Sequence, residues 1–373
     1  MRLPPFTLER YFSQHEFNVE LNLCASDCEA LSVRELLDLE PGAQDQLLGL
    51  ALGYTETRGS PALRDQVSRL YSSIGADGIL VHNGAEEGIF LFMSAMLERG
   101  DHLIVHSPCY QALHEIARGI GCRLTQWNAH EEEGWLLDPR ELERNIRHDT
   151  RVIVINSPHN PTGYHMPREV FDEVIRIADR HGVTVFSDEV YRGLEYRDAD
   201  RLPAAADASE RGVSLGVMSK TYGLAGLRVG WIATRNAEVM SRIEGLKDYT
   251  TICTSAPSEF LAEIALRHGE GLVARSRGIV GQNLALLSRF FARHADRFAW
   301  QTPKAGPIAF PRLIGGDAGN FCAALVKKSG VLLLPGSVYD DSGNHFRVGF
   351  GRRSMPEAVA RLDAFLQRGT VVA

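Results

Sequence analysis

Short runs of apolar, mostly β-branched residues recur through the middle of the chain, and five of them predict strands. They are His102–His106, Arg151–Ile155, Val183–Phe186, Val213–Met218 and Val229–Thr234. Because most of these runs are almost continuously apolar rather than alternating with polar residues, they are typical of strands buried on both faces.

Amphipathic segments with helix-start signals lie between these strands. Ser60 offers an N-cap and Pro61 a proline at the first helical position, and apolar residues follow at helical spacing as far as Tyr71. Pro167 opens a second such segment, and Gly182 stands where a C-cap is expected. The alternation predicts an α/β fold with a mainly parallel sheet covered by helices on both faces, a three-layer α/β/α domain.

The pattern changes after about residue 255. Helical spacing dominates there until Pro307–Leu313 and His345–Phe350, which read as strands of a second, smaller α+β lobe. A length of 373 residues also exceeds the usual size of one hydrophobic core, so two domains are expected.

Composition narrows the class of protein. An apolar content of 44% and a charged content of 23% are ordinary for a soluble globular protein. A formal net charge of −7 argues against nucleic-acid binding as the main function. No apolar run reaches the roughly 18 residues of a membrane span. The six dispersed cysteines predict reduced thiols in a cytoplasmic enzyme, and no metal site is expected.

The candidate chemistry centres on Lys220, which follows an apolar strand and precedes Arg228 by eight positions. Upstream lie Asn-Ser-Pro-His-Asn-Pro-Thr-Gly at 156–163 and Ser-Asp-Glu-Val-Tyr at 187–191. Such groups could hold a charged pyridine aldehyde at each polar corner. From about 54 to 347 the chain resembles the fold-type I pyridoxal 5′-phosphate (PLP) enzymes of the class I/II aminotransferase family, the aspartate aminotransferase superfamily.

The resemblance implies a role for each residue around the cofactor ring. Lys220 would form the Schiff base and then act as general base, which requires an amine that is neutral part of the time. Asp188 would pair with the pyridine nitrogen, which keeps the ring a strong electron sink. Tyr191 and Asn160 would donate hydrogen bonds to the phenolic oxygen, and Asn160 also borders the substrate. Lys220, Asp188 and Tyr191 are the expected catalytic residues.

The phosphate site is expected at a glycine turn that enters a helix. Main-chain groups of Gly84, Ala85 and Glu86 would bind the phosphate at the helix N-terminus. Ser219 would add a hydroxyl, and Arg228 a planar guanidinium that suits two phosphate oxygens. The side chain of Glu86 must turn away, because phosphate would repel it.

Aromatic and cationic residues complete the expected site. Tyr110 would stack on the cofactor ring, and Tyr54 matches the family tyrosine that reaches the phosphate of a partner subunit, which implies a homodimer with shared active sites. Arg347 is the candidate for the substrate α-carboxylate, with Arg352 and Arg353 as rivals. By the family arrangement, residues 41–260 form the PLP-binding large domain, and residues 1–40 and 261–373 form the small domain.

The expected reaction is transfer of an amino group from an L-amino acid to a 2-oxo acid by a ping-pong mechanism. The alternative is a PLP-dependent lyase or cyclase, C–S lyase-like or capreomycidine-synthase-like. It stays open because no second arginine for a substrate carboxylate can be assigned, and because Phe6–Tyr11 and Cys24–Ala30 look unlike a common aspartate aminotransferase entrance. A transcription regulator would need a DNA-binding module, for which residues 1–53 are too short and not basic.

Overall fold

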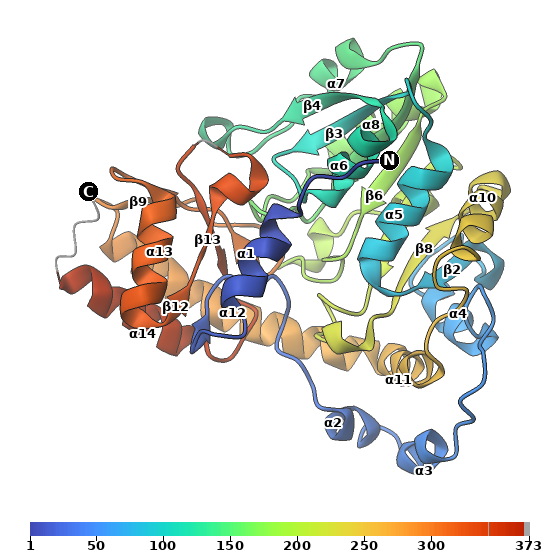
Figure 1. Cartoon of the computed structure of the whole chain (residues 1–373), viewed down its shortest axis with the longest axis horizontal. Helices are drawn as coiled ribbons and strands as arrows, with labels where there is room; N and C mark the ends of the chain where they lie inside the picture. Colours follow the sequence, from blue (N-terminus) through green and yellow to red (C-terminus); the bar gives the residue numbers. More distant parts are fainter. Residues whose placement is uncertain (342, 369–373) are drawn as a thin grey trace.

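A seven-stranded sheet organises most of the molecule (Figure 1). The computed structural model describes residues 1–341 and 343–368. The strand order is β2-β8-β7-β6-β5-β3-β4, and β8 alone runs antiparallel to its two neighbours. The strands are β2 (Ile79–His82), β3 (His102–Ser107), β4 (Arg123–Asn128), β5 (Thr150–Asn156), β6 (Thr184–Asp188), β7 (Gly212–Val217) and β8 (Gly230–Thr234).

Both faces of this sheet are buried under helices, as the apolar runs predict. In β5, Val152 and Val154 belong to a core with α5 and α6, while Ile153 and Ile155 face the opposite core with α8. This is the predicted three-layer α/β/α arrangement. The covering helices are α4 (Pro61–Ser68), α5 (Gly84–Met96), α6 (Ala112–Ile120), α7 (Pro139–Asn145), α8 (Arg168–His181), α9 (Ala205–Ala208), α10 (Ala237–Lys247) and α11 (Ala256–Arg267).

The predicted end of one helix at Gly182 is confirmed, whereas the helix predicted from Pro61 is shorter than expected. Gly182 ends α8 in the left-handed conformation at φ 70°, as a C-cap glycine should. The helix that begins at Pro61 is shorter than its apolar pattern, because α4 stops at Ser68. Tyr71 lies beyond the end of the helix, and its hydroxyl accepts a hydrogen bond from the indole N–H of Trp231 at 2.9 Å. This contact with the sheet takes the place of a further helical turn.

Small sheets lie beside the large one, and the C-terminal third of the chain supplies all of their strands except β1. The strands are β1 (Leu21–Asn22), β9 (Phe298–Ala299), β10 (Ile308–Ala309), β11 (Arg312–Leu313), β12 (Val331–Leu332), β13 (Leu334–Pro335) and β14 (Phe346–Gly349). β1 pairs in parallel with β12, so the N-terminal residues lie with the end of the chain. The limits 41–260, 1–40 and 261–373 stay a prediction for the domains.

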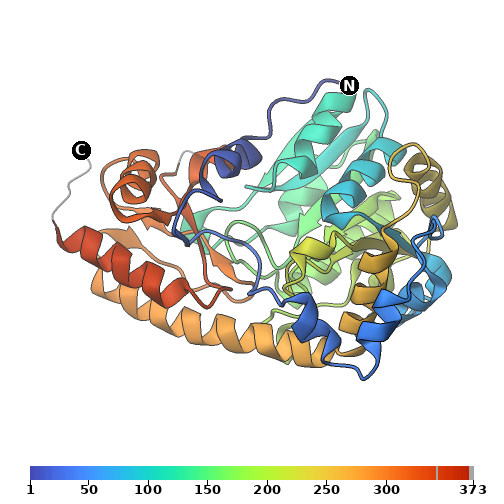
Figure 2. The ribbon, with the colours of Figure 1, turned by 60° about the horizontal axis from the view of Figure 1, so that its bottom comes forward.

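Helices connect and cover these parts. The long α12 (Gly269–Arg293) runs along one side of the molecule from the large sheet to the small ones (Figure 2). α13 (Ala318–Ser329) and α14 (Met355–Gln367) pack on the small sheets, and α1 (Thr7–His15), α2 (Val33–Leu37) and α3 (Ala43–Leu48) form the N-terminal segment. The short 3-10 helices are η1 (Ala76–Gly78), η2 (Glu131–Glu133), η3 (Asp198–Asp200), η4 (Ala225–Leu227) and η5 (Gly336–Tyr339). Across the described residues, no helix combines the length and apolarity that a membrane crossing requires.

Candidate active site

Three neighbouring strands bring the predicted site residues to one edge of the sheet. Asp188 ends β6, Asn160 follows β5, and Lys220 follows β7. Asn156 ties two of them together, because its amide nitrogen donates to the carbonyl of Asp188 at 2.9 Å and its oxygen accepts from the backbone N–H of Asn160 at 2.7 Å. Carboxyl ends of parallel strands meet at one edge, which is where open α/β sheets bind ligands.

Lys220 lies in contact with the N-terminal segment. Its Nζ donates to the hydroxyl of Ser26 at 2.8 Å. Burial lowers the pKa of Lys220, and the nearby charge of Arg347 lowers it further, while Asp27 and Asp188 act against this change. A lowered pKa favours the neutral amine, which covalent attachment and proton transfer both require.

Asp188 and Tyr191 present polar atoms that the protein itself leaves poorly satisfied. Asp188 is 5% exposed, accepts a hydrogen bond from the backbone N–H of Val190 at 3.2 Å, and has its pKa raised by burial to about 7. The Tyr191 hydroxyl is buried and has no hydrogen-bond partner among the described residues. Since buried polar groups normally find partners, both fit a ligand with a cationic ring nitrogen and an ionised oxygen, as PLP has.

The expected phosphate turn is assembled around Gly84. This glycine begins α5 at φ 74°, and a Cβ there would lie 2.4 Å from a guanidinium nitrogen of Arg228. The absence of a side chain at Gly84 therefore lets Arg228 approach the helix N-terminus, where backbone N–H groups also favour an anion. Ala85 and Glu86 follow in the first turn of α5. Ser219 is buried, with 7% of its surface exposed. These groups fit the phosphate of PLP.

Glu86 lies in the first turn of α5. Burial raises the pKa of Glu86 to about 7, so the side chain need not carry a full charge beside the phosphate turn. The hydroxyl of Tyr110 lies near its carboxyl and acts to lower the pKa of Glu86. Tyr110 itself follows β3, and its ring centroid lies 5.2 Å from that of Phe6.

Arg347 on β14 is buried at the same place, with 1% of its surface exposed. Its Nε and Nη2 donate to the carbonyl of Cys24 at 3.1 and 2.8 Å, and its Nη1 donates to Oδ1 of Asn160 at 3.2 Å. Tyr339 bonds both residues, donating its hydroxyl to Oδ1 of Asn160 at 2.9 Å and accepting from Arg347. The Nδ2 hydrogens of Asn160 remain for a ligand.

The other predicted arginines have partners of their own, and Tyr54 is exposed. Arg352 forms a bidentate ion pair with Asp27 at 3.0 and 2.9 Å, and the Arg353 backbone N–H donates to Glu29 at 2.8 Å. Tyr54 is 90% exposed and, within one chain, stays outside the group of residues around Lys220.

Sequence reasoning singled out Phe6–Tyr11 at the entrance but did not predict the helix α1 there or its contacts with site residues. α1 lies over the site between the large and small sheets (Figure 1). The ring of Phe12 lies 5.8 Å from the guanidinium carbon of Arg347, while Phe6 contacts Tyr110. Ser26 was missed as well, although the unusual Cys24–Ala30 segment was the available signal.

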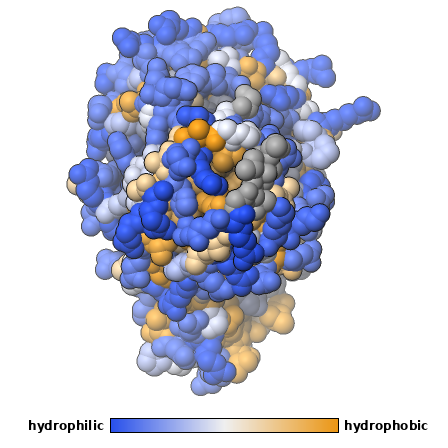
Figure 3. Space-filling view, turned by 90° about the vertical axis from the view of Figure 1, so that its left-hand side faces the viewer, coloured by the Kyte–Doolittle hydropathy of each residue, from blue (hydrophilic) through white to orange (hydrophobic). Residues whose placement is uncertain are grey.

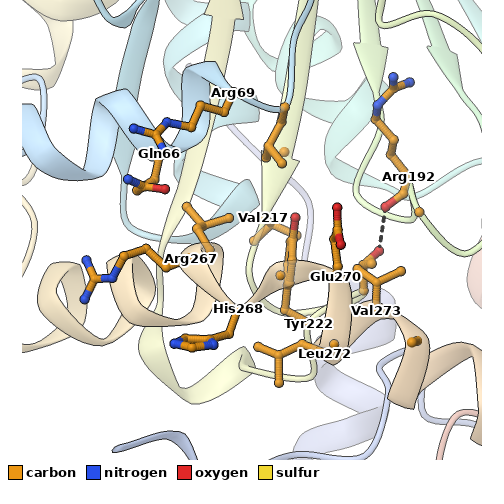
Figure 4. Close-up of a pocket in the computed structure, with 18 of the residues that line it drawn as sticks. Gln66, Arg69, Arg192, Val217, Tyr222, Arg267, His268, Glu270, Leu272 and Val273 are labelled. Carbon is orange, nitrogen blue, oxygen red and sulfur yellow. Dashed lines mark hydrogen bonds between the residues drawn. The ribbon is translucent and has the colours of Figure 1, made fainter. Parts of the chain in front are cut away.

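A large cavity that Lys220 does not line is a separate feature. It has a volume of about 1250 Å³ and lies between α4, the start of α12 and the loop that carries Tyr222 (Figure 4). Its lining includes Arg192, Arg267 and Tyr222 and contains none of the residues expected to bind the cofactor. Within the described ranges, no cluster of three or more His, Cys, Asp or Glu side chains could hold a metal ion.

Both the sequence and the fold are similar to those of known proteins. The family model for aminotransferase class I and II matches residues 19–362. Capreomycidine synthase of Streptomyces vinaceus is 27% identical over 93% of this chain and 90% of that protein. A PLP-dependent aminotransferase from Streptococcus suis is 32% identical with a TM-score of 0.93, covering 99% of both chains. The PLP-dependent cyclase OrfR is 27% identical with a TM-score of 0.90, also covering 99% of both chains.

Proposed function

The chain belongs to the class I and II aminotransferases, which are PLP-dependent enzymes, and we propose that it transfers the amino group of an L-amino acid to a 2-oxo acid. The observation that carries the proposal is the juxtaposition of Lys220 with Arg347. Lys220 donates a hydrogen bond to the hydroxyl of Ser26, and Arg347 donates to the carbonyl of Cys24, two residues earlier in the same segment. An amino acid whose carboxylate is bound by Arg347 therefore presents its α-carbon near the Lys220 amine.

The residues that would hold PLP are those assembled at the sheet edge. Asp188 would take the ring nitrogen, Tyr191 and Asn160 the phenolic oxygen, Tyr110 the ring face, and Lys220 the aldehyde. Gly84, Ala85, Glu86, Ser219 and Arg228 would surround the phosphate. When bound, PLP supplies an aldehyde for the substrate amine and a ring that accepts the electron pair released with the α-proton.

Lys220 would move the proton. Its Nζ takes the proton from the substrate α-carbon, because burial and Arg347 keep its pKa low. Ser26 holds that Nζ at 2.8 Å. Tyr339 and Asn160 hold the Arg347 guanidinium in one plane, so the carboxylate and the α-carbon are fixed together.

A lyase or cyclase is the second candidate, and two observations favour it. A capreomycidine synthase and a PLP-dependent cyclase are among the similar proteins. Arg352 is held by Asp27, which leaves it unsuited to bind the second carboxylate of a dicarboxylic substrate. In this reaction the same Lys220 step occurs, and the substrate side chain then loses or forms a bond.

The proposed partner, besides the amino acid and the 2-oxo acid, is a second copy of the chain. Large apolar side chains are exposed along the segment that contains α2 and α3: Val33, Leu39, Leu48, Leu52 and Tyr54. This segment projects at the lower end of the molecule in Figure 1, and the same end carries much hydrophobic surface in Figure 3. Exposed apolar surface of this kind marks an interface, and a homodimer would bring Tyr54 to the phosphate of the partner.

A single-turnover experiment tests the proposal. The PLP-loaded enzyme is mixed with single amino acids without an oxo acid, and the cofactor spectrum, oxo acid and ammonia are measured. Conversion to the pyridoxamine form with one equivalent of oxo acid and no ammonia is the expected result. A cofactor that stays in the aldehyde form while ammonia or a cyclised product accumulates would replace the aminotransferase by the second candidate.

A further inference from the structure

The side of α1 that faces the active site carries acidic residues. Glu9, Phe12 and Glu16 recur at spacings of three and four, which places them along one side of a helix. Phe12 fixes the direction of that side, because its ring lies over Arg347 at 5.8 Å. Phe6, three residues before Glu9, contacts Tyr110. Glu9 therefore lies between Phe6, which contacts Tyr110, and Phe12, whose ring lies over Arg347.

The electrostatics of the site agree with this placement. The charge of Glu9 acts on Lys220, on Glu86 and on Tyr110. Glu16 is near Arg352, Asp27, Glu9 and Arg347, although burial is the main reason that its pKa is raised. Two of the cations near this region are already engaged, because Arg352 is paired with Asp27 and Arg347 is reserved for the α-carboxylate.

The acidic side of α1 borders the residues proposed to hold the cofactor and the substrate carboxylate, because Phe6 contacts Tyr110 and Phe12 lies over Arg347. Tyr191 is 1% exposed, and its hydroxyl has no hydrogen-bond partner among the described residues. Arg347 is equally buried and holds a carbonyl and two side chains rather than a carboxylate. A substrate whose carboxylate binds Arg347 would occupy the inner end of the site. The side chain of that substrate would then extend to the outer end, where Glu9 lies.

We propose that Glu9, supported by Glu16, is a specificity-determining residue that selects an amino acid with a cationic side chain, a guanidinium or an ammonium. The inference rests on the proposed function, since it assumes that an amino acid binds with its carboxylate at Arg347. A carboxylate attracts a side-chain cation and repels a second substrate carboxylate, so the same residue selects for one class and against the other.

Binding of unreactive analogues tests the charge preference without catalysis. The probes are 5-guanidinopentanoate, its neutral isostere 5-ureidopentanoate, and hexanedioate, each titrated into the PLP-loaded enzyme by calorimetry. We expect the guanidino compound to bind about two- to fivefold more tightly than the ureido compound, the ratio that one exposed ion pair supplies. Hexanedioate should bind most weakly. Equal affinities, or tightest binding of hexanedioate, would overturn the proposal.

Substitutions then assign the preference to its residue. In Glu9→Gln the guanidino-over-ureido ratio should fall towards one while the affinity for the ureido compound is unchanged, and Glu16→Gln should lower the ratio by less. Glu210→Gln is the matched control, because Glu210 is exposed and precedes β7 at the end of the strand opposite Lys220. A ratio that Glu9→Gln leaves at the wild-type value would remove Glu9 from the role.

The reaction itself distinguishes failure of this inference from failure of the proposed function. L-Arginine, L-citrulline and L-glutamate are compared in the single-turnover reaction. Faster conversion with L-arginine, lost in Glu9→Gln, supports the inference. Conversion that is fastest with L-citrulline or L-glutamate contradicts it and leaves the aminotransferase in place. Spectral change with none of them, nor with any other amino acid, overturns the proposed function instead.

Discussion

Replacing Asp188 by asparagine should stabilise the cofactor-free protein at high pH. The carboxyl is 5% exposed, and burial raises its pKa to about 7, against about 4 in an unfolded chain. Between pH 4 and pH 7 the unfolded chain has lost this proton and the folded chain keeps it, so stability falls as the pH rises. Asparagine has nearly the same shape and no proton to lose, so Asp188→Asn removes this loss.

The difference between the two pKa values sets the size of the effect. A gap of about three corresponds to roughly 4 kcal/mol above pH 8, as an upper value. For a chain of this length that is on the order of 5 °C in the midpoint of thermal unfolding. Below pH 8 the advantage of the variant shrinks, and at pH 5 less than half of it should remain because Asp188 is then protonated in the folded protein.

Adding PLP should reverse the order. A cationic ring nitrogen stabilises the charged form of Asp188, so the wild type gains more from the cofactor than the variant does. The assay is scanning calorimetry of both proteins at pH 5 and pH 8, with and without PLP. Asp65→Asn on the exposed side of α4 is the control and should change neither comparison. Equal midpoints of the cofactor-free proteins at pH 8 would refute the reasoning.

Two further substitutions test the cofactor site. Lys220→Ala should abolish covalent attachment of PLP, seen in the absorption spectrum and by mass after borohydride reduction, while the unfolding midpoint of the cofactor-free protein changes little; a fully active variant would end this assignment. Arg228→Ala should raise the dissociation constant for PLP by about 10- to 100-fold, the value of one charge-assisted contact. Because Ser219 and the α5 N-terminus remain, binding should persist, and an unchanged constant measured by equilibrium dialysis would mean that Arg228 does not contact the phosphate.

Five of the seven strands of the sheet, and the residues at their ends, were predictable because both signals are local. A continuous apolar run indicates burial on both faces, and a polar residue directly after it lies at the sheet edge. Asp188, Asn160 and Lys220 follow this rule. Arg347 also follows from pattern, because Phe346 and Val348 alternate with it along β14. The family model over residues 19–362 confirms the predicted family.

The outer part of the site could not be predicted because its contacts join distant segments. Ser26 meets Lys220 across 194 positions, and Tyr339 meets Asn160 across 179. No periodicity or spacing encodes such pairs. β2 and β4 were missed as strands: β2 is short, and β4 has mostly exposed or half-buried side chains at the sheet edge. The antiparallel direction of β8 depends on the path of the chain rather than on composition.

The origin of the two halves of the site has a consequence for engineering. The groups expected to hold PLP come mainly from the edge of the large sheet, whereas Glu9 and Glu16, which are proposed to meet the substrate side chain, come from α1 and the residue that follows it. The N-terminal segment that contains α1 could therefore serve as a cassette, exchanged between relatives to change the substrate preference. The residues expected to hold PLP would stay the same. A bulky affinity tag at the N-terminus would be attached next to that cassette.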